Sequence, residues 1–415
     1  MAANRIFVVL VSTVLLSLAQ GCDVGSRSEA TPATFAGIVA LLEKHGDAVV
    51  LKGDGESRVL VSPHFQGRLF TLKVGTVEST GLVNAAAIVK GETDPQFNNF
   101  GAADRFWLGP EGGPFGLYFD PGVEFTREIW KVPAAFDKGA YKVISKDDAK
   151  VVMAQDMELV NYSKTKFKVH VDREVGAIKA AALPEDLKLS LPEGVQFSGA
   201  YSLNTMTNTG DAQWKEETGL IGIWILGQYN PSDSTVIIGP FKPGNEAELG
   251  PAFNDDYFGK LTVVSPNRFK VLENAVLFRA DARRVGKFGI SQQRTTGMAG
   301  SIDFGKNLLT IVKFDVPQNP ERYANSTWVK EQKEPFKGDV LQSYNHGVEG
   351  KPEVLAVVPF YELESTSPVR PLKPGESIRH RHATYHFQGD MEKLKAIAKQ
   401  LLGVDLQAVK DAMLK

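Results

Sequence analysis

Short apolar strands, separated by turn residues and rarely by helical segments, dominate the middle of this 415-residue sequence. Phe167, Val169 and Val171 alternate with polar residues, as expected for a strand with one buried face. Fully buried strands are predicted where apolar residues run continuously, over residues 220–226, 236–238, 308–316 and 353–361. The 39 glycines and 22 prolines punctuate these runs. Strands without regular intervening helices predict an antiparallel sandwich and argue against a parallel α/β sheet.

A hairpin pattern stands at the start of this β region. Residues 48–51 and 58–61 surround Gly53-Asp54-Gly55, which predicts a β-hairpin. Residues 68–74 alternate as a third strand, and a further short strand is expected over residues 117–119, after a loop rich in glycine and proline.

Helical periods are confined to the two ends of the chain. Residues 35–45 place apolar side chains on one helical face, and the same period returns over residues 391–414. We therefore expect a mostly β domain over residues 47–388, preceded by a short helix and followed by a helical tail over residues 389–415.

The N-terminal residues resemble a bacterial export signal. Arg5 is the only charge ahead of an apolar run over residues 6–18, which is short for a membrane span. Cys22, the only cysteine, stands where a bacterial lipobox carries its lipidated thiol. We expect residues 1–21 to be a signal peptide and residues 22–46 to be a lipid-anchored tether ending in a short helix. The alternative is an ordinary signal peptide without lipid.

The composition narrows the range of partners. The chain has 47 basic and 49 acidic residues and a formal net charge of −2, which leaves no electrostatic footprint for nucleic acid. A single cysteine allows no internal disulfide, so a hydrophobic core must stabilise the fold. The expected location is the bacterial cell envelope, in the periplasm or on the outer surface, with a membrane contact through the lipid anchor. The oligomeric state is left open.

The C-terminal part of the sequence concentrates titratable residues. A strand over residues 360–365 ends in acidic side chains, a Pro-Gly turn follows, and a second strand carries His380, His382 and His386. Acid–base and metal chemistry both need such a local concentration of titratable groups.

Two motifs in this part resemble the aldose 1-epimerase (galactose mutarotase-like) superfamily. They are Leu363-Glu364-Ser365 and, after a loop, Leu372-Lys373-Pro374-Gly375-Glu376. The resemblance implies an antiparallel β-supersandwich of two large sheets and a carbohydrate ligand. It also implies that Glu364 is the catalytic base, because the superfamily's base is the glutamate of the first motif. We expect the closest kinship with secreted bacterial proteins of this fold.

A second patch, residues 103–116, has the chemistry of a sugar site. Sugars present apolar ring faces, which suit an indole such as Trp107, and hydroxyl edges, which suit planar charged groups such as Arg105 and Glu111. In the superfamily this region resembles the arginine- and glycine-rich loop that holds the sugar. The structural alternative pairs Arg105 with Asp104 or Glu111 and places Trp107 in the core.

A third patch departs from the superfamily pattern. Residues 202–211 resemble the segment His-Thr-Tyr-Phe-Asn-x-Gly-Asp, whose histidine is the general acid, but Asn204 stands at the histidine position. An amide donates a hydrogen bond and cannot release a proton, so Asn204 is expected only to bind substrate. His346, beside a glycine, is the candidate for the missing acid. The alternatives are a polar strand end at Asn204 and an exposed turn histidine.

The histidine strand permits two interpretations. His380, His382 and His386 share one face of an extended segment, and His-x-His is also a metal-ligand spacing. The cupin-like motif that this resembles needs a glutamate in place of His386 and a second motif downstream, so no metal is expected. We expect His380 and His382 to line the sugar pocket or face solvent. Glu362 and Glu364 also share a face, where two carboxyl groups repel, share a proton or bind a cation.

These patterns leave three hypotheses for function. The first is a mutarotase-like isomerase with Glu364 as base, supported by Arg105 and His346. The second is a non-catalytic carbohydrate-binding or surface protein, which Asn204 favours. The third is a polysaccharide lyase or hydrolase, for which Glu111 and Glu364 are the only carboxyl pair we would propose. The sequence has no phosphate-binding Gly-Lys-Ser/Thr loop, no G-x-S-x-G elbow and no H-E-x-x-H helix, and no cofactor is expected.

Overall fold

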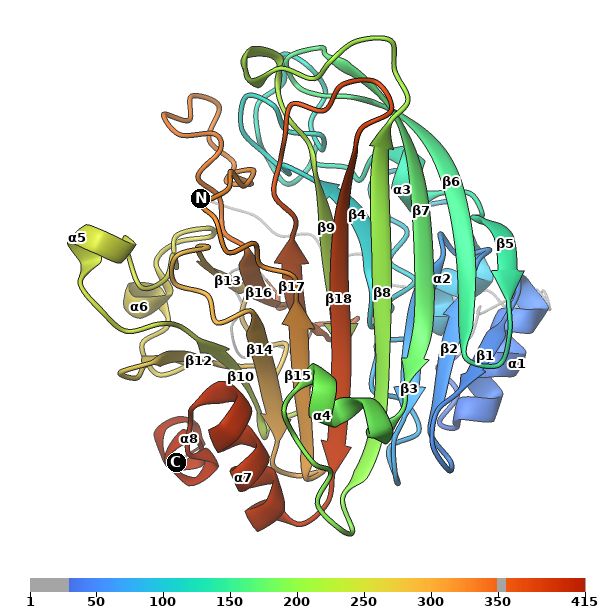
Figure 1. Ribbon diagram of the computed structural model, residues 1–415, viewed down its shortest axis with the longest axis vertical. Helices are drawn as coiled ribbons and strands as arrows, with labels where there is room; N and C mark the ends of the chain where they lie inside the picture. Colours follow the sequence, from blue (N-terminus) through green and yellow to red (C-terminus); the bar gives the residue numbers. More distant parts are fainter. Residues whose placement is uncertain (1–29, 349–355, 415) are drawn as a thin grey trace, which may run out of the picture.

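A computed structural model describes residues 30–348 and 356–414 of the chain (Figure 1). The expected signal peptide, Cys22 and the first part of the tether lie outside the described residues. The described chain is mostly β, with antiparallel pairing between the strands of its three sheets and few, short helices. The predicted mostly β, antiparallel sandwich is confirmed.

The largest sheet has ten strands and forms the wide layer seen in Figure 1. In spatial order its strands are β11 (Phe269–Val271), β12 (Ala275–Arg279), β10 (Thr235–Pro240), β14 (Met298–Asp303), β15 (Leu308–Phe314), β18 (Ser377–Gln388), β8 (Gln196–Asn208), β7 (Lys166–Ile178), β6 (Lys150–Val160) and β5 (Lys142–Lys146). The two long central strands, β8 and β18, pair along twelve consecutive residues, from Ser377 opposite Thr207 to Gln388 opposite Gln196.

A five-stranded sheet packs against the inner face of this layer. In spatial order its strands are β13 (Gly286–Ile290), β16 (Leu341–Asn345), β17 (Tyr361–Thr366), β9 (Gly222–Tyr229) and β4 (Arg105–Gly109). Apolar residues of both sheets, such as Ile225 and Leu363 of the smaller and Val312 of the larger, belong to one hydrophobic core. The two layers are therefore held together by burial of their facing apolar surfaces.

The alternation along β17 sets which side chains enter that core. The Tyr361 hydroxyl lies 2.7 Å from Ser301 Oγ, and the Ser365 hydroxyl lies 2.8 Å from His380 Nε2, so these residues face the ten-stranded sheet. Because successive strand side chains point to opposite faces, Glu362 and Glu364 face away from it. The outer face of the five-stranded sheet thus carries the acidic pair.

The N-terminal region adds a small sheet and two helices beside the sandwich. The sheet consists of β1 (Val49–Lys52), β2 (Arg58–Ser62) and β3 (Arg68–Lys73), and the helices are α1 (Phe35–His45) and α2 (Ala85–Lys90). Thr34 caps α1 by accepting a hydrogen bond from the Gly37 amide at 3.1 Å. The predicted helix, hairpin and third strand are confirmed, with strand ends shifted by one residue.

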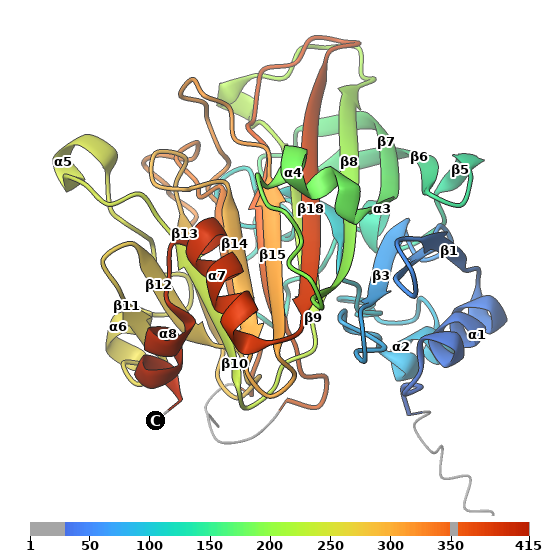
Figure 2. The ribbon, with the colours of Figure 1, turned by 60° about the horizontal axis from the view of Figure 1, so that its bottom comes forward.

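Two C-terminal helices, α7 (Met391–Leu402) and α8 (Leu406–Met413), cover part of the outer face of the ten-stranded sheet (Figure 2). Leu394 and Ile397 of α7 pack in one core with Val236 and Ile302 of the sheet. Gly403, at φ 72°, ends α7 in the left-handed conformation that glycine adopts at little cost. The predicted helical tail is confirmed, and no described helix is long and apolar enough to cross a membrane.

The remaining helical turns lie in connections. They are α3 (Ala134–Asp137), η1 (Ala180–Ala182), α4 (Leu183–Asp186), η2 (Glu216–Thr218), α5 (Glu246–Leu249) and α6 (Leu261–Val264).

One predicted strand is wrong in its bounds, and another does not form. Of the segment 353–361, residues 356–360 are described but form no strand, and β17 begins at Tyr361; Pro359, which lacks an amide hydrogen, precedes it. Residues 117–119 form no strand either, because their apolar side chains are buried by aromatic packing, for example Tyr118 against Trp130 at 5.9 Å, without a partner strand.

Candidate functional site

A cavity of about 190 Å³ opens on the outer face of the five-stranded sheet. Four of the five tryptophans of the chain line it, and we call it the indole pocket: Trp107, Trp130, Trp224 and Trp328. Trp107 and Trp224 are almost fully buried on β4 and β9, whereas Trp130 and Trp328 come from loops and are half-buried. The pocket therefore has a rigid aromatic floor and aromatic walls formed by loops.

The sheet register brings polar side chains into this floor. Lys287 of β13 lies opposite Tyr344 of β16, Tyr344 opposite Glu362 of β17, and Glu362 opposite Gln228 of β9. All four residues line the pocket. A single row across four strands thus presents an ammonium, a phenol, a carboxyl group and an amide to the same cavity.

Arg105 and Trp107 enter the pocket together from β4, where alternation places them on one face. The guanidinium of Arg105 forms an ion pair with Glu362 and lies 4.7 Å from the centre of the Trp107 ring. Its Nε and Nη1 have no hydrogen-bond partner among the described residues. The acidic partner of Arg105 is therefore Glu362 rather than Asp104 or Glu111, the two partners considered in the structural alternative.

Glu362 is the carboxyl group of β17 that lines the indole pocket. Burial raises its pKa to about 7, helped by the nearby charge of Glu364 and opposed by Arg105 and Lys287. A carboxyl group with a pKa near neutral pH can exchange protons at that pH, as a general acid or base must.

Glu364, the base implied by the family resemblance, lies behind the pocket wall. It is fully buried and does not line the cavity. Its Oε2 accepts hydrogen bonds from Trp224 Nε1 and Lys287 Nζ, both at 2.9 Å. Glu364 thus orients an indole and an ammonium that face the cavity. Sequence reasoning missed Lys287, since a single lysine in a short glycine-containing strand gives no pattern.

Glu111 and His346 also line the cavity. Glu111 accepts a hydrogen bond from Trp130 Nε1 at 2.9 Å, and burial raises its pKa. His346 stacks on Phe360 with ring centres 4.4 Å apart. Burial, then the charge of Arg127, lowers the pKa of His346 to about 4. Its imidazole is therefore neutral at pH 7 and holds no readily donated second proton.

Asn204, His380 and His382 lie between the two sheets, away from the indole pocket. Their side chains are fully buried. Ser365 Oγ lies 2.8 Å from both His380 Nε2 and His382 Nδ1, and Asn204 Oδ1 accepts a hydrogen bond from Arg173 at 2.6 Å. The structure thus brings together Arg105, Trp107, Glu111 and His346, with Glu364 behind them, and leaves these three residues out.

The described residues contain no group of three or more histidine, cysteine, aspartate or glutamate side chains placed to hold a metal ion. In the histidine strand, Ser365 occupies one ring nitrogen of each of two histidines, so these nitrogens already have a hydrogen-bond partner.

Residues 33–413 match the family of unknown function DUF6786. The chain belongs to this family. A comparison of this DUF6786 protein with the curated proteins finds no match.

Solved structures with a similar fold have low sequence identity to the DUF6786 protein. The Slr1438 protein from Synechocystis sp. PCC 6803 is 11% identical, with a TM-score of 0.46 over 83% of this chain and 96% of that one. A galactose mutarotase-like protein from Lactobacillus casei ATCC 334 is 12% identical, with a TM-score of 0.44 over 82% of this chain and 99% of that one. Similarity at this level assigns no role to any residue of the pocket.

Proposed function

We propose that this DUF6786 protein binds a carbohydrate in the indole pocket. The observation that carries the proposal is the meeting of four tryptophans with Arg105, Glu111, Glu362 and Lys287 around one small cavity. The flat apolar rings suit the C–H faces of a sugar. The planar charged groups and the ammonium suit its hydroxyl edge. The volume of about 190 Å³ lies below the roughly 300–1,000 Å³ of pockets for drug-sized ligands, which suits a ligand of about one sugar ring.

Polar atoms without a partner support a polar ligand. Arg105 Nε and Nη1 and Gln228 Oε1 are buried and make no hydrogen bond with the described residues, and both side chains line the cavity. Burying such atoms unpaired costs about 1–3 kcal/mol each. A sugar hydroxyl both donates and accepts, so it can satisfy the guanidinium and the amide oxygen together.

A second candidate function, proton transfer at the anomeric centre of the bound sugar, is favoured by Glu362. Anomer exchange begins when a base takes the proton of the anomeric hydroxyl; the bond between the anomeric carbon and the ring oxygen then breaks, and a donor protonates that oxygen. With its pKa raised to about 7, Glu362 suits the first step. The ammonium of Lys287, in the same row of the sheet, is the donor that the geometry supports for the ring oxygen.

The test is anomer exchange and binding by NMR on a panel of free monosaccharides. We expect exchange to fall at least about 100-fold in Glu362→Gln, and the rate in the unmodified protein to rise with pH through about 7 as Glu362 loses its proton. Glu364→Gln tests the positioning role of Glu364: it should lower exchange less than Glu362→Gln does, because it disturbs Trp224 and Lys287 but keeps Glu362. A folded Glu362→Gln variant that keeps full exchange shows that Glu362 is not the base. Binding without exchange leaves the binding function only, and no binding of any sugar refutes both.

We also propose that the protein is anchored in the bacterial cell envelope by a lipid on Cys22, after removal of residues 1–21. The support is the sequence pattern alone: a short apolar run followed directly by the single cysteine. Mass spectrometry of the protein from its native membrane fraction tests this. Cys22→Ser should release the protein into the soluble fraction, and an unmodified cysteine in the natural protein would refute the proposal.

A further inference from the structure

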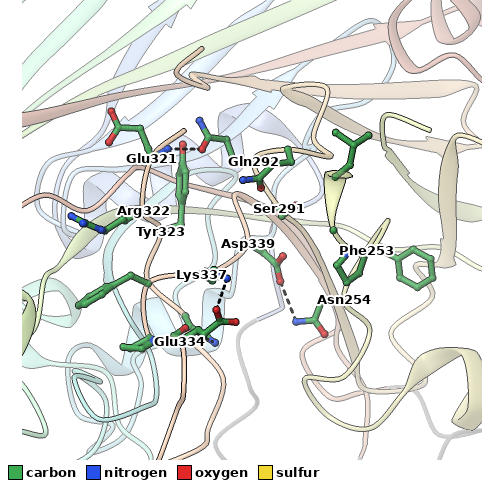
Figure 3. A pocket seen from close by; sticks show the side chains of 18 of the residues that line it. Phe253, Asn254, Ser291, Gln292, Glu321, Arg322, Tyr323, Glu334, Lys337 and Asp339 are labelled. Carbon is green, nitrogen blue, oxygen red and sulfur yellow. Dashed lines mark hydrogen bonds and ion pairs between the residues drawn. The ribbon is translucent and has the colours of Figure 1, made fainter. Parts of the chain in front are cut away.

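A second hollow, of about 750 Å³, opens beside the indole pocket. Figure 3 shows its lining, where Asp339 and Asn254 point toward one another and Glu334 lies close to Lys337. We call it the side hollow. It shares no lining residue with the indole pocket.

Both cavities lie on the same face of the five-stranded sheet. Lys287, which lines the indole pocket, and Gly289 are two residues apart on β13 and so face the same side. A Cβ on Gly289 would lie 2.2 Å from Asp339 Oδ2, so the Asp339 side chain packs directly on this face. Asp339 lines the side hollow.

The segment from Asn254 to Phe258 separates the two cavities. Asn254 lines the side hollow, and Phe258, 41% exposed, lines the indole pocket. Tyr257 between them contacts both sides: its hydroxyl donates to Asp339 Oδ2 at 2.7 Å, and its ring centre lies 5.4 Å from Lys287 Nζ. The partition is therefore about one side chain thick at this point.

Both cations that line the side hollow have a carboxylate partner. Arg322 pairs with Glu216 at 2.7 Å, and Lys337 pairs with Glu334. Glu321 pairs with Arg370 at 2.5 Å. Both lining cations are thus neutralised by neighbouring carboxylates, which disfavours an anionic ligand.

The remaining groups suit hydroxyls and ring faces. Asn254 and Gln293 supply amides, which both donate and accept hydrogen bonds, and Phe253 and Phe336 supply half-buried aromatic rings. Asp339 Oδ1 makes no hydrogen bond with any described residue, because both bonds to this carboxyl group end on Oδ2. A neutral polyhydroxylated ligand matches this lining.

We infer that the indole pocket and the side hollow are two subsites for one neutral oligosaccharide, with the chain crossing the partition at residues 254–258. The inference rests on the proposed carbohydrate-binding function and adds the size and charge of the ligand. The terminal sugar occupies the indole pocket, and the following units occupy the side hollow, whose larger volume accommodates more than one ring.

The experiment is calorimetric titration of the full chain with matched series of neutral glucans, mannans, galactans and xylans of one to six units. For the series that binds, we expect the affinity to rise at least roughly tenfold from the monosaccharide to the tetrasaccharide. The double variant Asn254→Ala/Gln293→Ala should return tetrasaccharide affinity to the monosaccharide value and leave monosaccharide affinity unchanged. Trp328→Ala should lower the affinity for both the monosaccharide and the tetrasaccharide.

Gln407→Ala is the matched control. This substitution removes an exposed amide side chain on α8 and should change neither affinity. Equal affinity for all chain lengths, or an equal loss for both ligands in the double variant, overturns the inference and leaves the indole pocket as a monosaccharide site. Failure of every series to bind refutes the proposed function as well. If the double variant does not fold, the length series on the unmodified protein decides alone.

Discussion

Polar side chains are buried on both faces of β17, yet only one of these faces borders the indole pocket. On the inner face, Ser365 joins His380 and His382 between the sheets. On the outer face, Glu362 meets Arg105 beside a cavity. Both faces leave buried hydrogen-bonding atoms without a partner among the described residues: Nδ1 of His380 and Nε2 of His382 on the inner face, and Nε and Nη1 of Arg105 on the outer face. Arg105 and Glu362 line a cavity of ligand size, whereas the two histidines are fully buried between the sheets. Access, more than the number of titratable groups, separates a site from a core network.

Burial acts on the two faces in the same direction with different consequences. On the inner face it lowers the pKa of His380 to about 3 and of His382 to about 4, so both are neutral at any ordinary pH. On the outer face it raises the pKa of Glu362 to about 7. Each shift favours the uncharged form, but only the carboxyl group is moved toward neutral pH, where proton exchange is useful.

The largest effect that distinguishes the two faces is expected for Arg173→Met. Arg173 belongs to the buried polar cluster between the sheets, which we call the inner network and which also contains Asp104 and Asn204. Arg173 is fully buried and donates to Asp104 Oδ1 and Asn204 Oδ1, both at 2.6 Å. Its removal leaves the Asp104 carboxylate buried without a counter-ion, which should lower the free energy of unfolding by about 3–5 kcal/mol. Urea denaturation measures the loss.

Lys52→Met is the control for that measurement, because the Lys52–Asp148 pair is largely exposed and should contribute little to stability. Sugar binding by Arg173→Met, measured where the variant is folded, should be unchanged. A stable Arg173→Met that has lost binding would show that the inner network belongs to the site, and the contrast between the two faces would fail.

The next effect is a loss of stability on acidification. Between about pH 4 and 6.5 the unfolded histidines are protonated while His380, His382 and His386 stay neutral in the fold, since burial lowers their pKa to about 3, 4 and 3. Their stabilising contribution is present above the unfolded pKa and declines as pH falls, by up to about 1.4 kcal/mol per pH unit for each histidine. Urea denaturation across this range measures the slope.

His380→Gln and His382→Gln should each make that slope shallower by up to one histidine's share. The comparison with unmodified protein is needed because Glu362 and Asp137, whose pKa burial raises to about 7 and about 6, act in the opposite sense and favour the fold at low pH. His170→Gln is the control: the His170 imidazole donates a hydrogen bond to the Asp156 carboxylate, which raises the pKa of His170, so the contribution of this histidine declines as pH rises. An unchanged slope in both variants would show that the inner histidines are hydrated.

Local patterns predicted most of the architecture. Helix α1 is bounded by Thr34, which caps its N-terminus, and by Gly46, and the hairpin of β1 and β2 turns at glycines. These features depend on neighbours within a few residues, so the sequence displays them. Alternation also predicted that Glu362 and Glu364 share a face, whereas Arg105 and Trp107 were expected in a loop and lie on β4. It could not predict which face would be open.

The site itself depended on pairing between distant strands. The family resemblance predicted Asn204 in the sugar site, and strand spacing allowed His380 and His382 to line it, but the register of β8 and β18 turns these side chains toward the inner layer. Lys287, Trp130 and Trp328 reach the pocket from one short strand and two loops that carry no motif. Sheet order and loop packing decide such placement, and no single segment encodes them.

The smallest effect on stability, paired with a clear effect on binding, is expected for Trp328→Ala. Trp328 is half-buried in a wall of the indole pocket and contacts Phe119 and Phe258 edge-on, with ring centres 5.0 and 6.0 Å away. Its loss should cost little stability, because loops rather than strands hold it, and should weaken sugar binding about tenfold, or about 1.4 kcal/mol. Titration with the best-bound monosaccharide, beside thermal unfolding, separates the two quantities.

Trp214→Phe, at the tryptophan outside the pocket, is the control for this prediction. It should disturb packing against Phe167 and leave sugar binding intact. If Trp328→Ala strongly lowers the stability of the protein while the folded variant keeps its affinity for sugar, the walls of the pocket are part of the core, and the outer face differs from the inner one in shape alone.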